Sequence, residues 1–329
     1  MCVILDRWVE RWQSEKVVGA MASYPAQFIW MNGEYVAWPD AKIHVNTDTV
    51  LRGGNVFEGL RAYYNPDERQ AFIFRLDDHL DRLWLSMKIL RMALPYSKSD
   101  LAAACVGLAA KNGFREDLQI RVIAYFGEGP LFAFEAGKVV TGAFIIASPR
   151  RSILDDQRGI ACCVSAWRRL GDNVMPPRVK AGANYLQSRY VSAQAHVDGY
   201  DGAIILNDRD KVAEGPGACL MMVRSGQPIT PPVTAGILES ITRSTLAELF
   251  TAELKLPLVE REMDRTELYI AEEAFFCGSA YEVTPITSVD RFPLGEGKIG
   301  PVTQQMRQLY RDIVRGKMPK YKHWLAPVY

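Results

Sequence analysis

Apolar residues recur three and four positions apart in several long stretches of the chain, which is the spacing of an amphipathic helix. The clearest stretch is 77–94, where one helix face would carry Leu80, Leu83, Met87 and Leu90. Asp77 is suited to cap its start. The same spacing predicts further helices over 97–112, 184–197, 240–254, 266–273 and 302–314. Gly113 and Gly199 follow two of them, where a left-handed residue commonly ends a helix.

Shorter apolar runs bounded by turn residues predict strands. A hairpin is expected over 27–38, because Asn32-Gly33 accepts the positive φ angles of a tight turn. A second hairpin pairs 203–206 with 211–213 around Asn207-Asp208. Further strands are expected at 72–74, 119–126, 139–147 and 160–167. Strands and helices do not alternate as regular βαβ units, so the pattern predicts an α+β fold with mixed sheets and flanking helices.

A length of 329 residues favours two domains. The polar, non-periodic stretch Pro149-Arg150-Arg151-Ser152 lies between two predicted strands and marks the expected boundary. We therefore expect a small α+β domain over 28–150 and a larger one over 151–329. Residues 1–27 are expected to form an N-terminal extension with a short helix that contains Trp8 and Trp12.

Composition and charge narrow the class of protein. Hydrophobic residues make up 48% and charged residues 23%, and the net charge is +1, so no bulk basic face for nucleic acid is expected. No apolar run approaches a membrane span, and the N-terminus has a four-residue apolar run before its first charge, unlike a signal peptide. The six cysteines form no CxxC pair, which indicates reduced thiols and a cytoplasmic protein.

Several motifs that carry chemistry in other proteins are not supported here. The GxGxxG match at 295–300 follows a loop and precedes Pro301, so it is expected to lead into the last helix. The four histidines have no metal-ligand spacing, so no metal is expected, and His79 is expected to be structural. No GxSxG is present for a serine hydrolase.

Two residues suit covalent cofactor chemistry, although each also has an ordinary explanation. Lys180 is followed by Ala181-Gly182-Ala183, which leaves room for a planar cofactor beside its amine. A lysine before a helix is more often a solvated charge. Glu214 ends a predicted strand before Gly215-Pro216-Gly217, where it can pair with a heterocyclic nitrogen or be a turn residue in water.

Two points along the chain suit a phosphate. A helix start offers free N–H groups and a favourable dipole, and the predicted helix at 240 begins with Ser240-Ile241-Thr242-Arg243. The same residues also fit an ordinary N-terminal helix cap that binds no ligand. The second point is Gly278-Ser279-Ala280, a run of small residues after an apolar stretch.

Taken in order, these segments resemble the branched-chain-amino-acid aminotransferase-like family, the class IV aminotransferases of pyridoxal 5′-phosphate (PLP) fold type IV. The resemblance runs from about residue 28 to the C-terminus. It rests on VFEGLRAY (56–63), FRLDDHLDRL (74–83), VKAGANYL (179–186), GYDGAIILN (199–207), AEGPG (213–217), PPVTAGILESITR (231–243), ELYIAEEAFFCGSAYEVTPITSVD (267–290) and GPVTQ (300–304).

The resemblance implies a two-domain D-amino-acid aminotransferase-like fold and a role for each matching residue. Lys180 would hold PLP as a Schiff base and shuttle the proton between substrate Cα and C4′ of the cofactor. Glu214 would pair with the pyridine nitrogen and Tyr185 with the phenolic oxygen. The phosphate would be held by Arg82, the amides of Ile241 and Thr242, and the hydroxyls of Thr242 and Ser279. The substrate would meet Phe57, Gly59, Arg61, Arg121, Ser279 and Ala280. We also expect Arg52 at the substrate, although it departs from the family pattern.

The implied reaction is a ping-pong transfer of an amino group from an L-amino acid, branched-chain-like or more polar, to a 2-oxo acid. Members of this family form homodimers or larger homo-oligomers and act in amino-acid metabolism, so the resemblance implies the same for this chain. Three alternatives stay open: a D-amino-acid or (R)-amine transaminase of the same fold, a lyase of the aminodeoxychorismate type, and a non-catalytic PLP-binding protein.

Some positions depart from the family pattern on the substrate side. Arg52 and Gln119 stand where tyrosines are common, whereas Arg121 is retained. The loop PRRSILDDQRG (149–159) is shorter and more basic than expected, Ala218 and Cys219 follow the turn after Glu214, and Ser240 replaces a glycine. Arg52 and Arg150 motivate the hypothesis of a more cationic pocket, which takes a substrate with an additional polar or anionic group. The alternative is that both arginines point to solvent.

Overall fold

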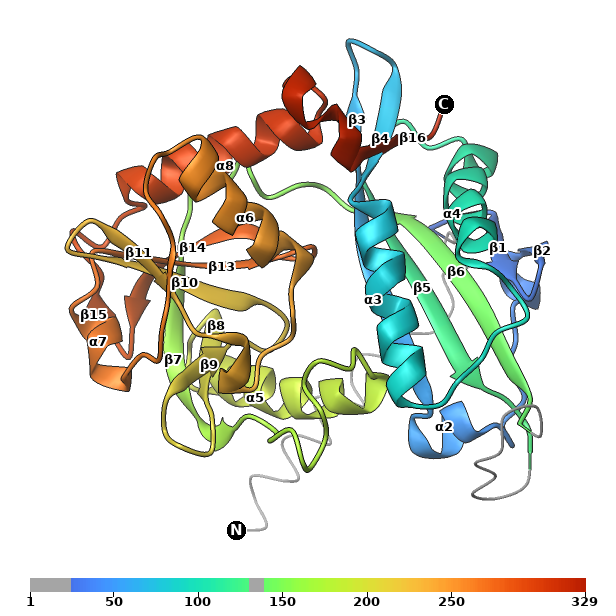
Figure 1. The fold of residues 1–329 in the computed structure, drawn as a ribbon, viewed down its shortest axis with the longest axis horizontal. Helices are drawn as coiled ribbons and strands as arrows, with labels where there is room; N and C mark the ends of the chain where they lie inside the picture. The colour runs from blue at the N-terminus through green and yellow to red at the C-terminus, as the bar shows by residue number, and fades with distance from the viewer. Residues whose placement is uncertain (1–24, 130–138) are drawn as a thin grey trace, which may run out of the picture.

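Two β-sheets with flanking helices make up the part of the chain that the computed structural model describes, residues 25–129 and 139–329 (Figure 1). The architecture is α+β, as predicted. The helix expected around Trp8 and Trp12 lies outside the described residues.

The first sheet is antiparallel, with the strand order β16-β4-β3-β5-β6-β1-β2. Its strands are β1 (Phe28–Met31), β2 (Glu34–Ala37), β3 (Asn55–Asn65), β4 (Gln70–Phe74), β5 (Leu118–Phe126), β6 (Thr141–Pro149) and β16 (Leu325–Pro327). The helical elements of this half are η1 (Trp38–Asp40), α2 (Asp48–Arg52), α3 (Leu76–Ile89) and α4 (Lys98–Asn112). The sheet contains β16 because the chain returns to this half at its C-terminal end (Figure 1).

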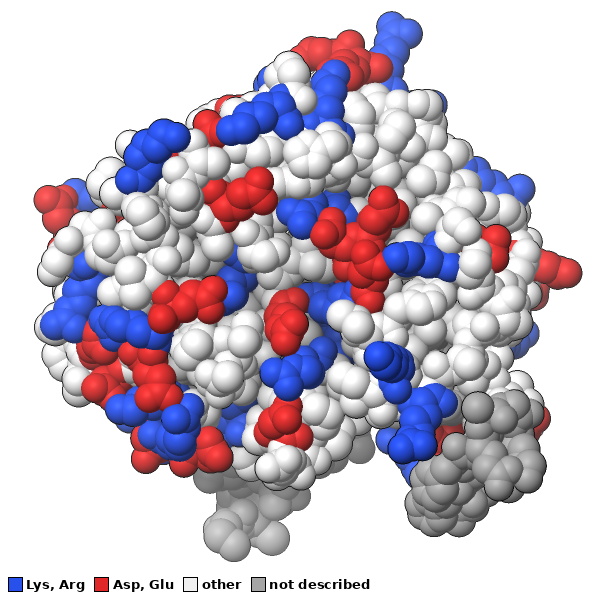
Figure 2. All heavy atoms as spheres, viewed as in Figure 1, with Lys and Arg blue, Asp and Glu red and all other residues white. Residues whose placement is uncertain are grey.

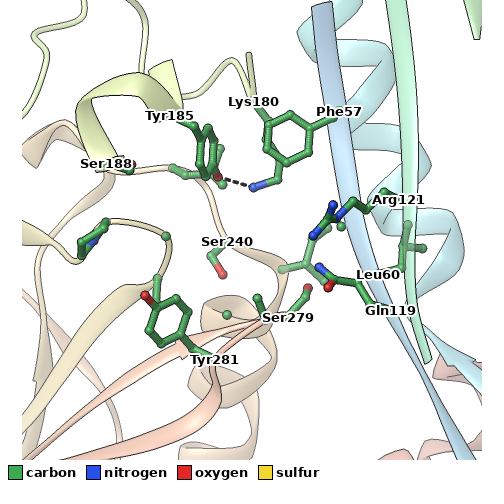
Figure 3. A pocket seen from close by; sticks show the side chains of 18 of the residues that line it. Phe57, Leu60, Gln119, Arg121, Lys180, Tyr185, Ser188, Ser240, Ser279 and Tyr281 are labelled. Carbon is green, nitrogen blue, oxygen red and sulfur yellow. Dashed lines mark hydrogen bonds between the residues drawn. The ribbon is translucent and has the colours of Figure 1, made fainter. Parts of the chain in front are cut away.

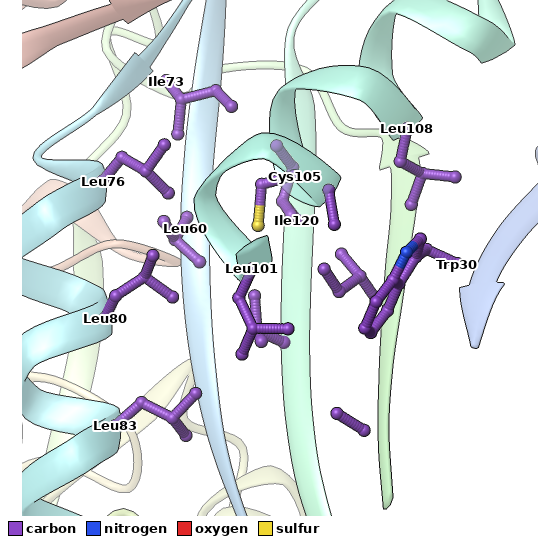
Figure 4. Close-up of a cluster of buried hydrophobic side chains, with 14 of the residues drawn as sticks. Trp30, Leu60, Ile73, Leu76, Leu80, Leu83, Leu101, Cys105, Leu108 and Ile120 are labelled. Atoms are coloured by element: carbon purple, nitrogen blue, oxygen red, sulfur yellow. The ribbon is translucent and has the colours of Figure 1, made fainter. Parts of the chain in front are cut away.

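Leucines of α3 and α4 pack on this sheet and form the first core. Figure 4 shows the side chains of both helices facing the strands: Leu76, Leu80 and Leu83 of α3, Leu101, Cys105 and Leu108 of α4, and Leu60 and Ile120 of the sheet. All are at most 5% exposed, so the burial of these apolar side chains stabilises the half that carries β3.

The second sheet is mixed and contains nine strands. Its strands are β7 (Ile160–Arg168), β8 (Gly202–Leu206), β9 (Val212–Glu214), β10 (Cys219–Arg224), β11 (Gln227–Thr230), β12 (Val259–Glu260), β13 (Glu273–Gly278), β14 (Glu282–Val289) and β15 (Phe292–Pro293). Strand β10 pairs with β13 and also with β9, so part of the sheet closes into a ring. The helical elements are η2 (Gly182–Asn184), α5 (Tyr185–Val197), η3 (Val233–Ala235), α6 (Ile241–Ala252), α7 (Arg265–Tyr269), α8 (Pro301–Val314) and η4 (Pro319–Trp324).

Several predictions that depend on local chemistry are confirmed. Asn32 and Gly33 have φ of 49° and 97° in the first hairpin, and β8 pairs with β9 in the second. Gly113 ends α4 with φ of 68°, as predicted, and the structure adds a capping box between Ser97 and Asp100 at the start of that helix. Pro301 occupies the first turn of α8, as expected for the segment after the rejected GxGxxG match.

Three predictions about element limits were wrong. Helix α3 begins after Arg75 rather than with an Asp77 cap, and it ends at Ile89 instead of residue 94. Arg91 has φ of 54°, and this left-handed residue turns the chain so that Met92 is buried. Helix α7 ends at Tyr269, because Glu273 already belongs to β13.

The predicted domain boundary at residue 150 falls just after the end of β6 and stays a prediction. The five cysteines that the structure describes are all buried and free. No helix among the described residues is long and apolar enough to cross a membrane. On the face in Figure 2, acidic and basic side chains are interspersed rather than gathered by sign.

Candidate active site

A cavity of about 1000 Å³ lies between the two halves of the molecule. Its walls come from β3, β5 and β6 on one side, and from α5, the β9–β10 turn, the start of α6 and the β13–β14 turn on the other (Figure 3). A cavity of this size that draws polar groups from several elements is the usual form of a small-molecule site.

Lys180 points into this cavity and is held by aromatic neighbours. Its Nζ donates a hydrogen bond to Tyr185 Oη at 2.5 Å and lies 4.8 Å from the ring centroids of both Tyr185 and Phe57 (Figure 3). The two rings meet edge to face. The backbone is fixed as well, because Phe57 N–H donates to the Lys180 carbonyl at 2.9 Å. Strand β3 therefore sets the position of the amine, although Lys180 belongs to the other half of the chain.

Glu214 ends β9 and is 5% exposed. Arg169 contacts its Oε1 at 2.8 Å, and the Leu238 amide donates to its Oε2 at 3.3 Å. Burial raises the pKa of Glu214, and the Arg169 guanidinium acts against that rise. Arg169 was missed in the sequence, because nothing in Arg168-Arg169 distinguishes a buried partner from a surface cation.

An anion-binding end is built at the start of α6. Ser240 caps the helix, and its hydroxyl accepts from the Arg243 amide at 3.2 Å. Within the described residues the amides of Ile241 and Thr242 have no acceptor, so two first-turn N–H groups remain for a ligand. Ile241 lines the cavity, whereas the Thr242 side chain is buried and does not, so only its backbone is suitably placed.

Arg82 lines the same end of the cavity and is held from behind by a buried carboxylate. Its Nε and one terminal nitrogen donate to Glu58 at 2.7 and 2.8 Å, and the other donates to the Glu239 carbonyl at 2.7 Å. Glu58 is fully buried and also lies 2.7 Å from His79 Nδ1. Burial alone would raise the pKa of Glu58, but Arg82 and His79 outweigh it and hold that pKa far below its usual value.

The predicted substrate residues Phe57, Gly59, Arg61, Arg121 and Ala280 all line the cavity, as does Ser279. Figure 3 shows Arg121 directed inward from β5. Among the described residues no hydrogen bond or ion pair engages its guanidinium. A Cβ added to Gly59 would meet no atom within 4 Å, so this glycine leaves space open in the wall.

Arg150 joins the two halves across the cavity. Its guanidinium donates to Gln119 Oε1 and to the Ala280 carbonyl, both at 2.9 Å, and its own carbonyl accepts from Arg61 at 2.8 Å. Burial lowers the pKa of Arg150, and the neighbouring Arg61 and Arg121 lower it further. A carboxylate oxygen of Glu282 lies 3.8 Å from the Arg61 guanidinium. The wall is therefore rich in positive charge.

Arg52 does not line this cavity, and its place in the substrate site stays a prediction. It lies on α2 with a side chain 41% exposed, bonds to Asp48 at 2.6 Å, and is not among the lining residues. The pair is one helical turn apart, and Gly53 then ends the helix in a left-handed conformation. Of the two arginines behind the cationic-pocket hypothesis, only Arg150 reaches the cavity.

Glu58 and His79 were also missed as members of the site, although His79 is buried as a structural histidine would be. Within the described residues no group of His, Cys, Asp and Glu side chains could hold a metal ion. The cavity thus combines a primary amine beside a phenol, a buried carboxylate, and a helix start with a guanidinium. Those are the contacts that a planar cofactor with a phosphate requires.

Comparison with known proteins agrees with this geometry. The family described as amino-transferase class IV matches residues 55–289. A probable branched-chain-amino-acid aminotransferase of Aquifex aeolicus (strain VF5) is 38% identical over 317 residues, which cover 94% of this chain and 99% of the relative.

Two solved structures are similar over nearly their whole length. The branched-chain amino acid aminotransferase from Thermobaculum terrenum in its PLP form has a TM-score of 0.88 and 41% identity, covering 92% of this chain and 99% of that one. The branched-chain aminotransferase from the thermophilic archaeon Thermoproteus uzoniensis, solved with norvaline, has a TM-score of 0.86 and 40% identity, with coverage of 92% and 100%.

Proposed function

The chain belongs to the class IV aminotransferase family, and from this premise we propose how its cavity works and what it accepts. It is a PLP-dependent aminotransferase of fold type IV, an enzyme of the EC 2.6.1 type. We propose that it moves an amino group from an L-amino acid to a 2-oxo acid by a ping-pong reaction.

The residues of the cavity fit PLP. Lys180 is the amine that would hold the cofactor covalently, with Tyr185 beside its phenolic oxygen and Glu214 at its pyridine nitrogen. The phosphate would be held by Arg82, the amides of Ile241 and Thr242, and the Ser279 hydroxyl. The observation that carries this assignment is the pair of first-turn amides without acceptors at the same cavity as the Lys180 amine. When bound, PLP supplies an electron sink that makes the substrate Cα–H acidic and carries the amino group between the two substrates.

The chain's own groups would orient the substrate and move its proton. Lys180 Nζ is the base that takes the proton from Cα, and the bond to Tyr185 Oη at 2.5 Å sets the direction of that amine. Arg169, 2.8 Å from Glu214, favours the ionised form of this carboxyl, which in turn favours a protonated pyridine nitrogen. The Ala280 amide and Ser279, at the turn between β13 and β14, are positioned to receive the α-carboxylate.

The cationic wall supports a donor whose side chain is polar or anionic rather than purely aliphatic. Arg121 has no partner in the described part of the chain, and Arg150 offers further N–H groups beyond its two bonds. A carboxylate brought between them would meet two guanidiniums in a partly dry cavity, where charge-assisted bonds are strongest.

The visible spectrum of the purified protein tests this function. A yellow protein is expected, and its band should bleach with L-glutamate more readily than with L-leucine, and not with D-alanine or an (R)-amine. The Lys180→Ala variant is the matched control, which should bind the cofactor without the wild-type band. Bleaching by D-alanine or the amine would refute the L-amino-acid assignment, and pyruvate release without a 2-oxo acid would indicate a lyase. Wild-type biological activity in Lys180→Ala would favour a non-catalytic role.

We further propose that the protein is a homodimer. Apolar side chains are exposed along one side of α5 and beside it: Leu186, Tyr190 and Trp167, the last two stacked on each other. Val50 and Leu51 of α2 are exposed as well. Apolar groups gathered in this way commonly face a partner. Light scattering should give twice the mass of the chain, and a monomer at micromolar concentration would refute the assembly.

A further inference from the structure

A buried chain of polar contacts runs behind the anion-binding end of the cavity and connects α3 to the β13–β14 turn. Glu58 Oε2 lies 2.7 Å from His79 Nδ1, and His79 Nε2 lies 3.3 Å from Ser279 Oγ. Glu58 is 0% exposed and His79 is 2% exposed, so water does not compete for either contact. Ser279 itself lines the cavity (Figure 3).

The first contact fixes which histidine nitrogen carries a proton. Glu58 is ionised, because it receives two guanidinium N–H groups of Arg82, and an ionised carboxylate only accepts. His79 Nδ1 therefore donates to Glu58 in every protonation state of the ring. Only Nε2 changes: it is a lone pair in the neutral ring and an N–H in the charged ring.

The state of Nε2 decides the direction of the Ser279 hydroxyl. Beside a neutral ring, Ser279 donates its hydrogen to Nε2, and its oxygen presents lone pairs to the cavity. Beside a protonated ring, Ser279 accepts from Nε2–H, and its own hydrogen is available to the cavity. An oxyanion needs a donor there, so it favours the second arrangement, in which the hydroxyl donates to it without leaving the buried Nε2 unpaired.

The charges around His79 fit a ring that is neutral until an anion arrives. Burial lowers the pKa of His79 even though Glu58 raises it, and the cations Arg82 and Lys180 lower it further. The other charged group coupled to it is Asp78 on its own helix. A phosphate beyond Ser279 adds negative charge on the side where the facing groups are cationic, which favours the protonated ring.

We propose that His79 is a proton-linked positioning residue: the protein takes up one proton at His79 when a phosphate binds at Ser279 and Arg82. The identity of that phosphate as part of PLP rests on the proposed function. By linkage, phosphate affinity falls about tenfold per pH unit as pH rises through the window between the two pKa values of His79, without and with ligand.

The test is calorimetric titration of the cofactor-free protein with pyridoxine 5′-phosphate, which has no aldehyde and does not react with Lys180. Heats measured in two buffers of different ionisation enthalpy give the number of protons taken up. The matched variant is His79→Gln, whose amide can donate to Ser279 but does not titrate. Wild type is expected to take up about one proton more than His79→Gln. In the His79→Asn variant, whose amide reaches Glu58 but not Ser279, the dissociation constant should rise about tenfold or more.

A second measurement needs no variant. His79 is the only buried histidine of the four, because His44, His196 and His323 are exposed. In protein labelled with ¹⁵N-histidine, one ring should therefore change its Nε2 from unprotonated to protonated on ligand addition at neutral pH. Equal proton uptake in wild type and His79→Gln, or a His79 ring unchanged by ligand, would overturn the inference while binding itself supports the proposed function. Failure of the wild type to bind pyridoxine 5′-phosphate would refute both.

Discussion

Replacing Glu58 with glutamine is expected to destabilise the fold and to weaken cofactor binding together. The change keeps the shape of the side chain and removes its negative charge. In the wild type, the Glu58 carboxylate accepts from Arg82 at 2.7 and 2.8 Å and lies 2.7 Å from His79 Nδ1. At about 4 Å between charge centres and an effective dielectric constant near 20, one such pair is worth about 4 kcal/mol before desolvation. Breaking a buried pair from one side costs about 3–5 kcal/mol, because the remaining charge stays buried.

The assay is urea unfolding of the cofactor-free protein at pH 7, so that ligand linkage does not enter the free energy of unfolding. The matched control is Asp81→Asn on the same helix, because Asp81 pairs with Lys98 in a contact whose side chains are 57% and 46% exposed. That exposed pair should contribute less than about 1 kcal/mol. In a parallel titration, Glu58→Gln should bind PLP at least about tenfold more weakly, because Arg82 loses its fixed direction.

Acid should remove the difference between Glu58→Gln and wild type. The pKa of Glu58 is lowered in the fold, so its stabilising contribution is fully present above the unfolded glutamate pKa, about 4.3, and is lost as pH falls below it. The two proteins should therefore differ most at neutral pH, begin to approach each other below about pH 4, and become equal only as pH falls through the much lower pKa of folded Glu58. A Glu58→Gln protein within about 1 kcal/mol of wild type at pH 7 would refute the reasoning, since the buried pair would then be worth no more than a surface one.

Three further substitutions probe the cavity walls. Arg150→Met should lower the ratio of kcat/KM for L-glutamate to that for L-leucine about tenfold or more, because it removes charged hydrogen-bond donors from the cavity wall. An unchanged ratio would show that Arg150 does not determine substrate specificity. Gly59→Val should leave the melting temperature nearly unchanged but raise KM for bulky donors about tenfold or more, because the added atoms enter open space. Arg169→Gln should weaken PLP binding, and the loss should grow as pH is lowered from 8 to 6, because Glu214 loses the cation that opposes its raised pKa. A fluorescence titration that gives the variant the same PLP affinity at both pH values would contradict this.

Local chemistry explains which parts of the fold were predictable. The hairpin turn at Asn32-Gly33 and the end of α4 at Gly113 depend on residues close together in the chain, and both formed as expected. Strand β3 was not predicted, because Glu58, Gly59 and Arg61 interrupt its apolar residues. Both charged residues are buried there, and each contacts residues distant in the chain. A buried charge is recognisable only once its partner is known.

The same distinction applies to the site. Lys180 and Glu214 were singled out from their neighbours in the sequence, and the resemblance to a family added Arg82 and Tyr185; all four line one cavity. Arg169 was missed, because its significance lies entirely in a contact with a residue 45 positions away. Arg52 was placed in the site from its order along the chain, which says nothing about which way its side chain turns, and it does not line the cavity.

The polar groups of the cavity are also the groups that join its two halves. Arg82 of α3 donates to the Glu239 carbonyl before α6, and Arg150 after β6 donates to the Ala280 carbonyl after β13. The Phe57 amide of β3 donates to the Lys180 carbonyl. A relative shift of the halves would therefore displace the Lys180 amine, the Arg82 guanidinium and the Arg150 guanidinium together. Groups fixed before the ligand arrives need little reorganisation during the reaction. The free energy that holds them in place comes from packing far from the cofactor. Substitutions that loosen the contact between the halves should consequently reduce cofactor affinity, even where they remove no atom from the cavity.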